Sequence, residues 1–364
     1  MKIKEVLDAL ERFAPLPFQD GFDNAGLQVG LTDAEVTGAL LCLDVTEAVV
    51  DEAIAQGFNL IVAHHPLLFH GRKSITDADY VGRCLLKAIR NDIVVYAAHT
   101  NLDNLYGGVN FEMARRLGLQ QVEILQPKEG MLLKLAVYVP ATHAGQLRTA
   151  LFEAGCGAIG KYDSCSFNTE GTGTFRAGED THPYCGRPGE LYSGREVRVE
   201  TVLPAYCKRR VLKALLENHP YEEPAYDFYP LSQAWNSVGS GVVGVLPEEM
   251  DEVDFLQRIK KEFSVACLRH NALTGRRVKR VALCGGAGAF LISDALKAGA
   301  DVFLTGEIKY HEFFGYEGKI LLAEAGHYET EQFTPYLLQE TLRRLCPTLT
   351  VRCTEVCTNP IHYL

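Results

Sequence analysis

Long apolar runs are absent from this sequence, and no stretch reaches about 18 residues, the length that a membrane-spanning helix requires. Residues 1–6 begin an amphipathic helix and lack the pattern of a signal peptide. We therefore predict a cytoplasmic protein that has no membrane partner.

Positive charge is also scarce, because 36 Lys and Arg residues stand against 46 Asp and Glu residues, for a net charge of −10. Affinity for nucleic acid comes largely from neutralising phosphates, so a nucleic-acid partner is not expected. No Walker A motif is present either. Recognition of a triphosphate would therefore have to use other residues.

Cysteine and glycine motifs of the usual binding sites are missing as well. The eleven cysteines contain no Cys-x2-Cys pair, and Cys353 and Cys357 are too isolated to form a four-ligand zinc site. We expect reduced, mostly buried thiols.

Residues 239–244 fit Gly-x-Gly-x-x-Gly, but Pro247 follows and no helix opens there, so we predict the start of a strand and no dinucleotide site.

The first third of the 364 residues alternates strands with helices, which is typical of a parallel sheet with crossover helices and hence of an α/β fold. Thr46 is positioned to cap one of these helices, and Gly57 lies just past its end. Apolar runs predict strands at residues 38–43, 60–63 and 93–98. Helical spacing predicts helices at residues 46–55 and 81–90.

The last third repeats this pattern. A strand at residues 278–284 and a helix at 290–298 precede residues 299–307, which align with residues 57–65. The strand at 320–325 matches the one at 93–98. Two similar α/β halves are therefore predicted, at residues 1–127 and 233–364.

Histidines and carboxylates follow the ends of these strands. His64 and His65 come directly after residues 60–63, and ligands bind outside the carboxyl ends of the strands in such sheets. Alone, a His-His pair often packs or is solvated, and a His-x3-carboxylate pair is often an ordinary hydrogen bond on a helix. Recurrence in both halves favours one metal site assembled between them, from the pairs His99/Asp103 and His327/Glu331.

The middle segment, residues 128–232, has a different composition. Its predicted order is strand, helix, strand, strand, helix, strand, which is that of a ferredoxin-like α+β domain. The glycine- and threonine-rich residues 169–195 are expected to form a loop and hairpin. We predict a small domain inserted between the two halves.

Five motifs stand out along the chain, at residues 23–30, 63–66, 99–103, 305–311 and 325–331. Taken together, they resemble those of the GTP cyclohydrolase I type 2 family, also called the NIF-three-like family. The middle segment is similar to the PII/CutA-like domain that some bacterial members insert, including residues 219–223. One departure is Glu307, where many members have Asp.

This resemblance implies two α/β halves around a binuclear metal site, assembled as a toroidal homohexamer. It assigns the metal ligands to His64, His65, Asp103, His327 and Glu331. Imidazole suits zinc, iron, nickel and cobalt, and Asp103 or Glu331 could bridge two ions. We expect two divalent ions per chain, with zinc or iron favoured and manganese, nickel or cobalt as alternatives.

Three histidines and two carboxylates leave coordination positions open for water, as in catalytic sites. A water between two such ions becomes a hydroxide near neutral pH, so hydrolysis is the expected reaction. On a purine nucleotide this nucleophile would add at C8. His99 or His311 could then donate a proton, and Glu307 could orient one of them.

Residues 284–289 lie between a strand and a helix. The backbone N–H groups of Gly285, Gly286 and Gly288 could hold an anionic part of the substrate there. A tight turn without a ligand is the alternative.

Three functions remain open: a GTP cyclohydrolase-type hydrolase, a hydrolase of another nucleotide or a phosphodiester, and a non-enzymatic, metal-binding regulatory hexamer. A cavity at the metals that is wide enough for a nucleotide would favour the first two.

Overall fold

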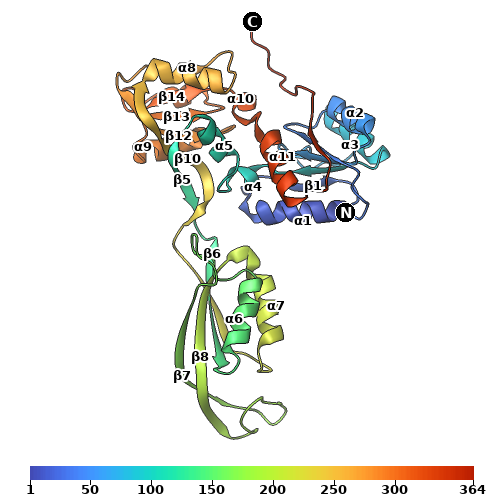
Figure 1. Cartoon of the computed structure of the whole chain (residues 1–364), viewed down its shortest axis with the longest axis vertical. Helices are drawn as coiled ribbons and strands as arrows, with labels where there is room; N and C mark the ends of the chain where they lie inside the picture. Colours follow the sequence, from blue (N-terminus) through green and yellow to red (C-terminus); the bar gives the residue numbers. More distant parts are fainter. The chain divides into compact units, whose positions relative to one another are not determined.

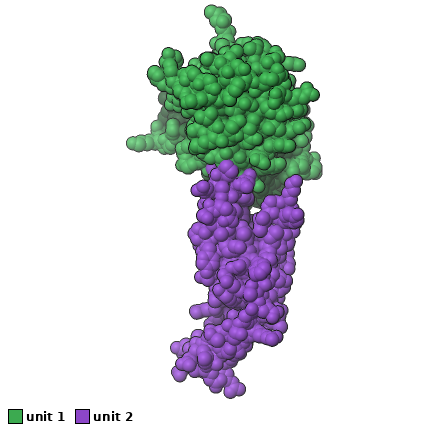
Figure 2. Space-filling view, turned by 90° about the vertical axis from the view of Figure 1, so that its left-hand side faces the viewer, with its two compact units in different colours: residues 1–126, 237–364 green, residues 127–236 purple.

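The computed structural model describes residues 1–364, which form two compact units. One unit consists of residues 1–126 and 237–364, and the other of residues 127–236 (Figure 2). The sequence predicts boundaries at 127/128 and 232/233. The second boundary lies later because the chain first pairs with the larger unit at Ser237, whose carbonyl accepts a hydrogen bond from the Tyr106 N–H.

The first sheet of the larger unit has the strand order β1-β4-β3-β2-β15. The last four strands of this order run parallel, and β1 is antiparallel to β4. All residues of β2, β3 and β4 are buried, as their continuous apolar runs predict. The strand bounds are β1 Gly26–Val29, β2 Ala39–Cys42, β3 Leu60–Ala63, β4 Val94–Ala97 and β15 Val351–Cys353.

Helices cover both faces of this sheet (Figure 1). Helices α1 (Ile3–Phe13) and α11 (Thr334–Leu345) pack on one face, and α2 (Glu47–Gln56) and α3 (Tyr80–Arg90) on the other. The predicted ends of α2 are confirmed, because the Thr46 side chain accepts a hydrogen bond from the Val49 N–H and Gly57 adopts a φ of 68°.

The second sheet of this unit has the order β11-β14-β13-β12-β10-β5. Strands β12, β13 and β14 are parallel, whereas β10 is antiparallel to β12 and β11 is antiparallel to β14. Residues 239–244 lie inside β10, which confirms a strand where the sequence resembles a dinucleotide motif. The bounds are β5 Gln120–Lys128, β10 Trp235–Asp251, β11 Arg269–His270, β12 Arg277–Cys284, β13 Val302–Thr305 and β14 Leu321–Glu324.

Helices also pack on both faces of the second sheet. Apolar residues of α5 (Val109–Arg116) and α8 (Glu252–Glu262) contact one face, and those of α9 (Ile292–Lys297) contact the other. Short helices connect the strands near the sheet ends: η1 Leu16–Phe18, α4 Thr100–Asp103, η3 Ala289–Leu291, η4 Tyr310–Phe313 and α10 His327–Glu331.

The smaller unit contains a four-stranded antiparallel sheet of order β7-β8-β6-β9, with α6 and α7 packed on one face. Strands β7 and β8 form a long hairpin whose pairing extends to Arg176 and Leu191, so the loop is confined to residues 177–190. Most side chains of β7 are exposed, which is why the sequence lacks the apolar alternation of a strand there. The bounds are β6 Leu132–Pro140, α6 Ala144–Glu153, β7 Ser166–Arg176, β8 Leu191–Pro204, η2 Ala205–Cys207, α7 Lys208–Asn218 and β9 Tyr226–Pro230.

None of the helices is long and apolar enough to cross a membrane. All eleven cysteines are free thiols, and the exposed ones are Cys267 and Cys357.

Candidate metal centre

The candidate ligands all follow the carboxyl ends of parallel strands. His64 and His65 come directly after β3, and His99 comes two residues after β4. In the second sheet, His327 and Glu331 lie on α10, which follows β14. Both sheets therefore direct polar side chains from their carboxyl ends into one region of the larger unit, as open α/β sheets do.

Each histidine of this region is anchored through its Nδ1 atom. His64 Nδ1 lies 2.7 Å from the Ala98 carbonyl, which can only accept, so Nδ1 carries the proton. The other three rings are held by carboxylates. The Nδ1–carboxylate distances are 2.7 Å each for His65 and Asp44, His99 and Asp23, and His327 and Glu307. Such partners are typical of metal-ligating histidines, because they fix the ring and leave Nε2 for the ion.

The Nε2 atoms face two carboxylates. Glu331 Oε2 lies 2.9 Å from His65 Nε2, 3.1 Å from His327 Nε2 and 3.8 Å from His64 Nε2. Asp103 Oδ1 lies 3.6 Å from His64 Nε2. Three groups of donor atoms lie within 4.8 Å of one another: His64, His65 and His99; His65, His327 and Glu331; and His64, Asp103 and Glu331.

Two of these atoms are buried without a hydrogen-bond partner, namely His64 Nε2 and Asp103 Oδ1. Their separation is too long for a hydrogen bond between them. Burying an unpartnered polar atom costs about 1–3 kcal/mol, so such atoms are rare without a role. An imidazole nitrogen with a free lone pair and a nearby carboxylate oxygen are two donor atoms that suit a divalent transition metal. The residues present therefore fit a metal ion.

Electrostatics of the cluster lead to the same conclusion. Burial raises the pKa of Asp103 well above its ordinary value, and Glu331 adds to this shift. Burial also acts on Glu331, but its interactions with His327, His64 and His65 outweigh it and hold the pKa well below its ordinary value. Burial opposes protonation of His65 and His327, yet their carboxylate partners raise the pKa to about 10 and about 9. Divalent cations can replace protons held in this way around a buried carboxylate.

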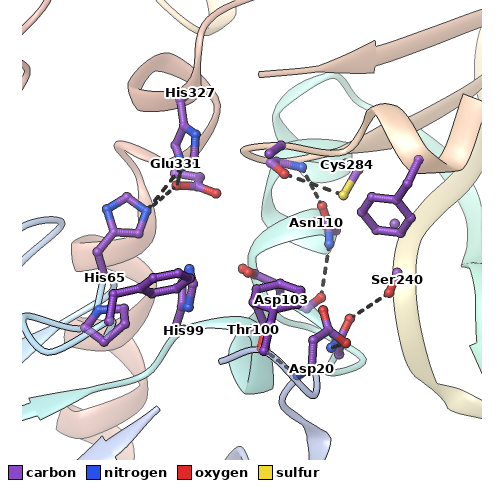
Figure 3. Close-up of a pocket in the computed structure, with 18 residues that line it drawn as sticks. Asp20, His65, His99, Thr100, Asp103, Asn110, Ser240, Cys284, His327 and Glu331 are labelled. Atoms are coloured by element: carbon purple, nitrogen blue, oxygen red, sulfur yellow. Dashed lines mark hydrogen bonds and ion pairs between the residues drawn. The ribbon is translucent and has the colours of Figure 1, made fainter. Parts of the chain in front are cut away.

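The cluster opens into a pocket of about 390 Å³, within the range of about 300–1,000 Å³ that is usual for small-molecule sites. Phe22, Phe69 and Phe290 also line the pocket and are 67%, 40% and 60% exposed. Figure 3 shows His65, His99, His327 and Glu331 on one side of the pocket, with Asn110, Ser240 and Cys284 on the other. The cluster is therefore accessible to a small molecule.

In a comparison with known proteins, the model of the Duf34/NIF3 (NGG1p interacting factor 3) family matches residues 1–360. The chain belongs to this family. A Halalkalibacterium halodurans protein named GTP cyclohydrolase 1 type 2 homolog is 44% identical over 308 residues, which cover 84% of this chain and 82% of that protein. A Bacillus subtilis protein of the same name is 37% identical over 369 residues, which cover 99% and 98%. The crystal structure of a Bacillus cereus protein related to NIF3 has 38% identity and a TM-score of 0.88, over 100% of this chain and 99% of that one.

The residues predicted for proton transfer have different surroundings. His99 lies beside His64 and His65 and lines the pocket. His311 is exposed on η4 and belongs neither to the pocket lining nor to any of the three donor groups. The contact that Glu307 makes is with His327, whose Nδ1 lies 2.7 Å from Glu307 Oε1.

The turn after β12 does not offer the anion site that its sequence suggests. The N–H groups of Gly285, Gly286 and Gly288 donate to side-chain oxygens of Asn110, Thr330 and Thr305, at 2.8, 3.1 and 2.9 Å respectively. These three donors are therefore already satisfied by the protein. Gly286 instead lies so close to Glu331 that a Cβ atom there would clash with the Glu331 carboxylate.

Two positioning carboxylates were not predicted from the sequence. Asp44 follows β2, and Asp23 lies in one of the five family motifs, where no role was expected for it. Asp44 is also bound by the C-terminal segment, since the Thr358 hydroxyl donates to its Oδ2 at 2.8 Å. The position of Asp44 just after a parallel strand could have marked it as a site residue. Residue spacing does not reveal that its partner is His65.

Proposed function

We propose that this chain is a binuclear-metal-dependent hydrolase that acts on a nucleotide-type substrate. The observation that carries the proposal is the pair of buried, unpartnered donor atoms, His64 Nε2 and Asp103 Oδ1, in a cluster that opens into a small-molecule pocket. The printed name of the relatives, GTP cyclohydrolase 1 type 2 homolog, supports a nucleotide of the GTP type as the first substrate to test.

Two divalent ions would be shared among five residues. His64 and Asp103 would hold one ion, and His65 and His327 would hold the other. Glu331 would be shared by the two ions, because it belongs both to the donor group of His64 and Asp103 and to that of His65 and His327. Zinc or iron is favoured by the imidazole-rich donor set, with manganese, nickel or cobalt as alternatives. When bound, such ions lower the pKa of a coordinated water to about 7 and so supply a hydrolytic nucleophile.

The protein side chains would position the substrate and move protons. Asp44 and Glu307 hold His65 and His327 through Nδ1. His99, held by Asp23, lines the pocket without belonging to the five ligands and is our candidate for the general acid. The exposed phenylalanine rings at the pocket offer a surface on which a planar base can stack.

We further propose the arrangement that family resemblance implies. The two α/β halves of the larger unit would form one metal-binding domain, and residues 127–236 would be an inserted PII/CutA-like domain. The chain would assemble into a toroidal homohexamer in the cytoplasm.

A second candidate is a non-enzymatic metal-binding or regulatory role. It is favoured by one specific observation: the three glycine N–H groups predicted to hold an anionic part of the substrate are already bound to protein oxygens. A hydrolase of another nucleotide or of a phosphodiester would use the same metals.

The test combines elemental analysis with product analysis. Purified, metal-loaded protein is incubated with GTP and a nucleotide panel, and formate release and products are measured. The matched variants are His64→Ala/Glu331→Ala and Glu312→Ala, which changes an exposed residue of η4. We expect two metals per chain and turnover in the wild type and in Glu312→Ala, and loss of both in the double variant. Two bound metals without turnover of any nucleotide would reject the nucleotide hydrolase and favour the regulatory role.

A further inference from the structure

The smaller unit contains a cavity of its own, with a volume of about 540 Å³. Its walls come from β6, β7 and β8 and from residues 177–184 and 221–225. None of the three candidate metal groups includes a residue of this unit. The function proposed above therefore leaves this cavity without a role.

Aromatic rings form much of its wall, namely those of Tyr138, Phe175, Tyr184 and Tyr221. The Tyr221 ring centroid lies 6.0 Å from that of Phe175 and 6.2 Å from that of Tyr184. The faces of such rings carry partial negative charge, so they attract cations and also offer apolar surface to an alkyl chain.

Carboxylates add negative charge to the same cavity. Glu196, Glu222 and Glu223 line it together with one guanidinium, that of Arg176, so three negative charges stand against one positive charge. An excess of negative charge beside aromatic faces favours a cationic ligand and disfavours an anionic one.

Glu196 is held in a defined position. Its Oε1 accepts a hydrogen bond from the Tyr221 hydroxyl at 2.8 Å. Its other oxygen lies against Gly173 of β7, where any Cβ atom would clash with it. The carboxylate is thus fixed by a ring of the aromatic wall and by a glycine on the neighbouring strand, which lowers the entropy cost of pairing it with a ligand.

The loop of residues 177–190 is tied to residues 221 and 222 of the cavity wall. The backbone N–H of His182 donates to Glu222 Oε2 at 3.0 Å, and the Cys185 thiol lies 3.6 Å from the Tyr221 hydroxyl oxygen. These contacts hold a largely polar loop against the aromatic wall. The cavity is therefore formed before any ligand binds.

We propose that this cavity binds an organic cation of the amine or guanidinium class. The N–H groups of the cation pair with the Glu196 carboxylate in a charge-assisted hydrogen bond, and its alkyl portion lies against Tyr221 and the neighbouring rings. A nucleotide is disfavoured, because its phosphates would lie beside the three carboxylates.

The test is isothermal titration calorimetry of the full chain with agmatine, which carries a guanidinium and an ammonium group on one alkyl chain. The wild type should bind agmatine saturably. Glu196→Gln keeps the shape of the side chain but removes its charge, and should weaken binding by at least about 10-fold. Tyr221→Phe keeps the ring but releases Glu196, and should weaken binding less.

Glu200→Gln is the matched control, because Glu200 lies on the same strand and pairs with Arg198 at 2.7 Å outside the cavity. This variant should bind agmatine like the wild type, as should His64→Ala/Glu331→Ala, so the outcome is independent of the metal centre. No binding of agmatine at millimolar concentration would overturn the proposal. Equal binding by Glu196→Gln would also overturn it.

Discussion

Replacing Asp44 tests how far the metal centre depends on the carboxylate that holds His65. Asp44 Oδ1 accepts from His65 Nδ1 at 2.7 Å, and Oδ2 accepts from the Thr358 hydroxyl at 2.8 Å. Asp44→Asn can keep both hydrogen bonds, since its amide oxygen accepts from His65 and its NH2 group can donate to Thr358. The variant therefore removes the negative charge that makes the imidazole a stronger ligand.

The expected loss of metal affinity is about 10- to 100-fold, the range found for such partners of ligating histidines, which corresponds to about 1.4–2.7 kcal/mol. The assay is competition between the protein and a chromogenic chelator, with metal content checked by elemental analysis. Thermal unfolding of the metal-free forms establishes that the variant is folded. The measured quantity is metal affinity, so the test does not require that the substrate be known.

Two threonines of the C-terminal segment supply a matched pair. Thr358→Val removes only the hydroxyl that holds Asp44 and should weaken metal binding by a smaller factor than Asp44→Asn, with recovery in Thr358→Ser. Thr354→Val removes a hydrogen bond from the same segment to Glu52 and should leave metal affinity unchanged. Wild-type affinity in Asp44→Asn would refute the reasoning, as would equal effects of the two valine substitutions.

Three further predictions concern the surroundings of the cluster. Gly286→Ala should lose bound metal, because the new Cβ atom displaces the Glu331 carboxylate. Gly275→Ala, which is also at positive φ but in open space, should retain the metal. Equal metal content of the two variants by elemental analysis would contradict this prediction. His311→Gln should keep wild-type metal content and turnover, and a drop in either would return His311 to the site. Burial opposes ionisation of Asp23, but hydrogen bonds with His99 and Thr100 lower its pKa to about 2, so its stabilising contribution is present above about pH 4 and is lost as the pH falls towards 2. Chemical unfolding between pH 5 and pH 2 should show a shallower loss of stability in Asp23→Asn than in the wild type, and parallel curves would argue against a paired Asp23.

Local sequence determined the elements and their ends. Apolar runs such as residues 60–63 must be buried on both faces, and Thr46 and Gly57 mark helix ends, because these effects act within a few residues of the chain. Side chains that follow parallel strands meet at one edge of a sheet, so the recurrence of His-x3-carboxylate pairs in the sequence was enough to propose a shared site. The family followed from the same motifs and is confirmed.

Only the tertiary structure decided which of these side chains meet. His65 and Glu331 are 266 positions apart in the chain yet 2.9 Å apart in space, and no spacing rule carries that information. The same holds for Asp44 as the partner of His65 and for the exposure of His311. The glycine turn after β12 is the clearest case. Its sequence suggests that the backbone N–H groups are free to bind an anion, but in the structure they donate hydrogen bonds to side chains from distant parts of the chain. Strand ends are local properties of the chain, whereas partners, accessibility and unpartnered atoms are set by packing between residues far apart in sequence.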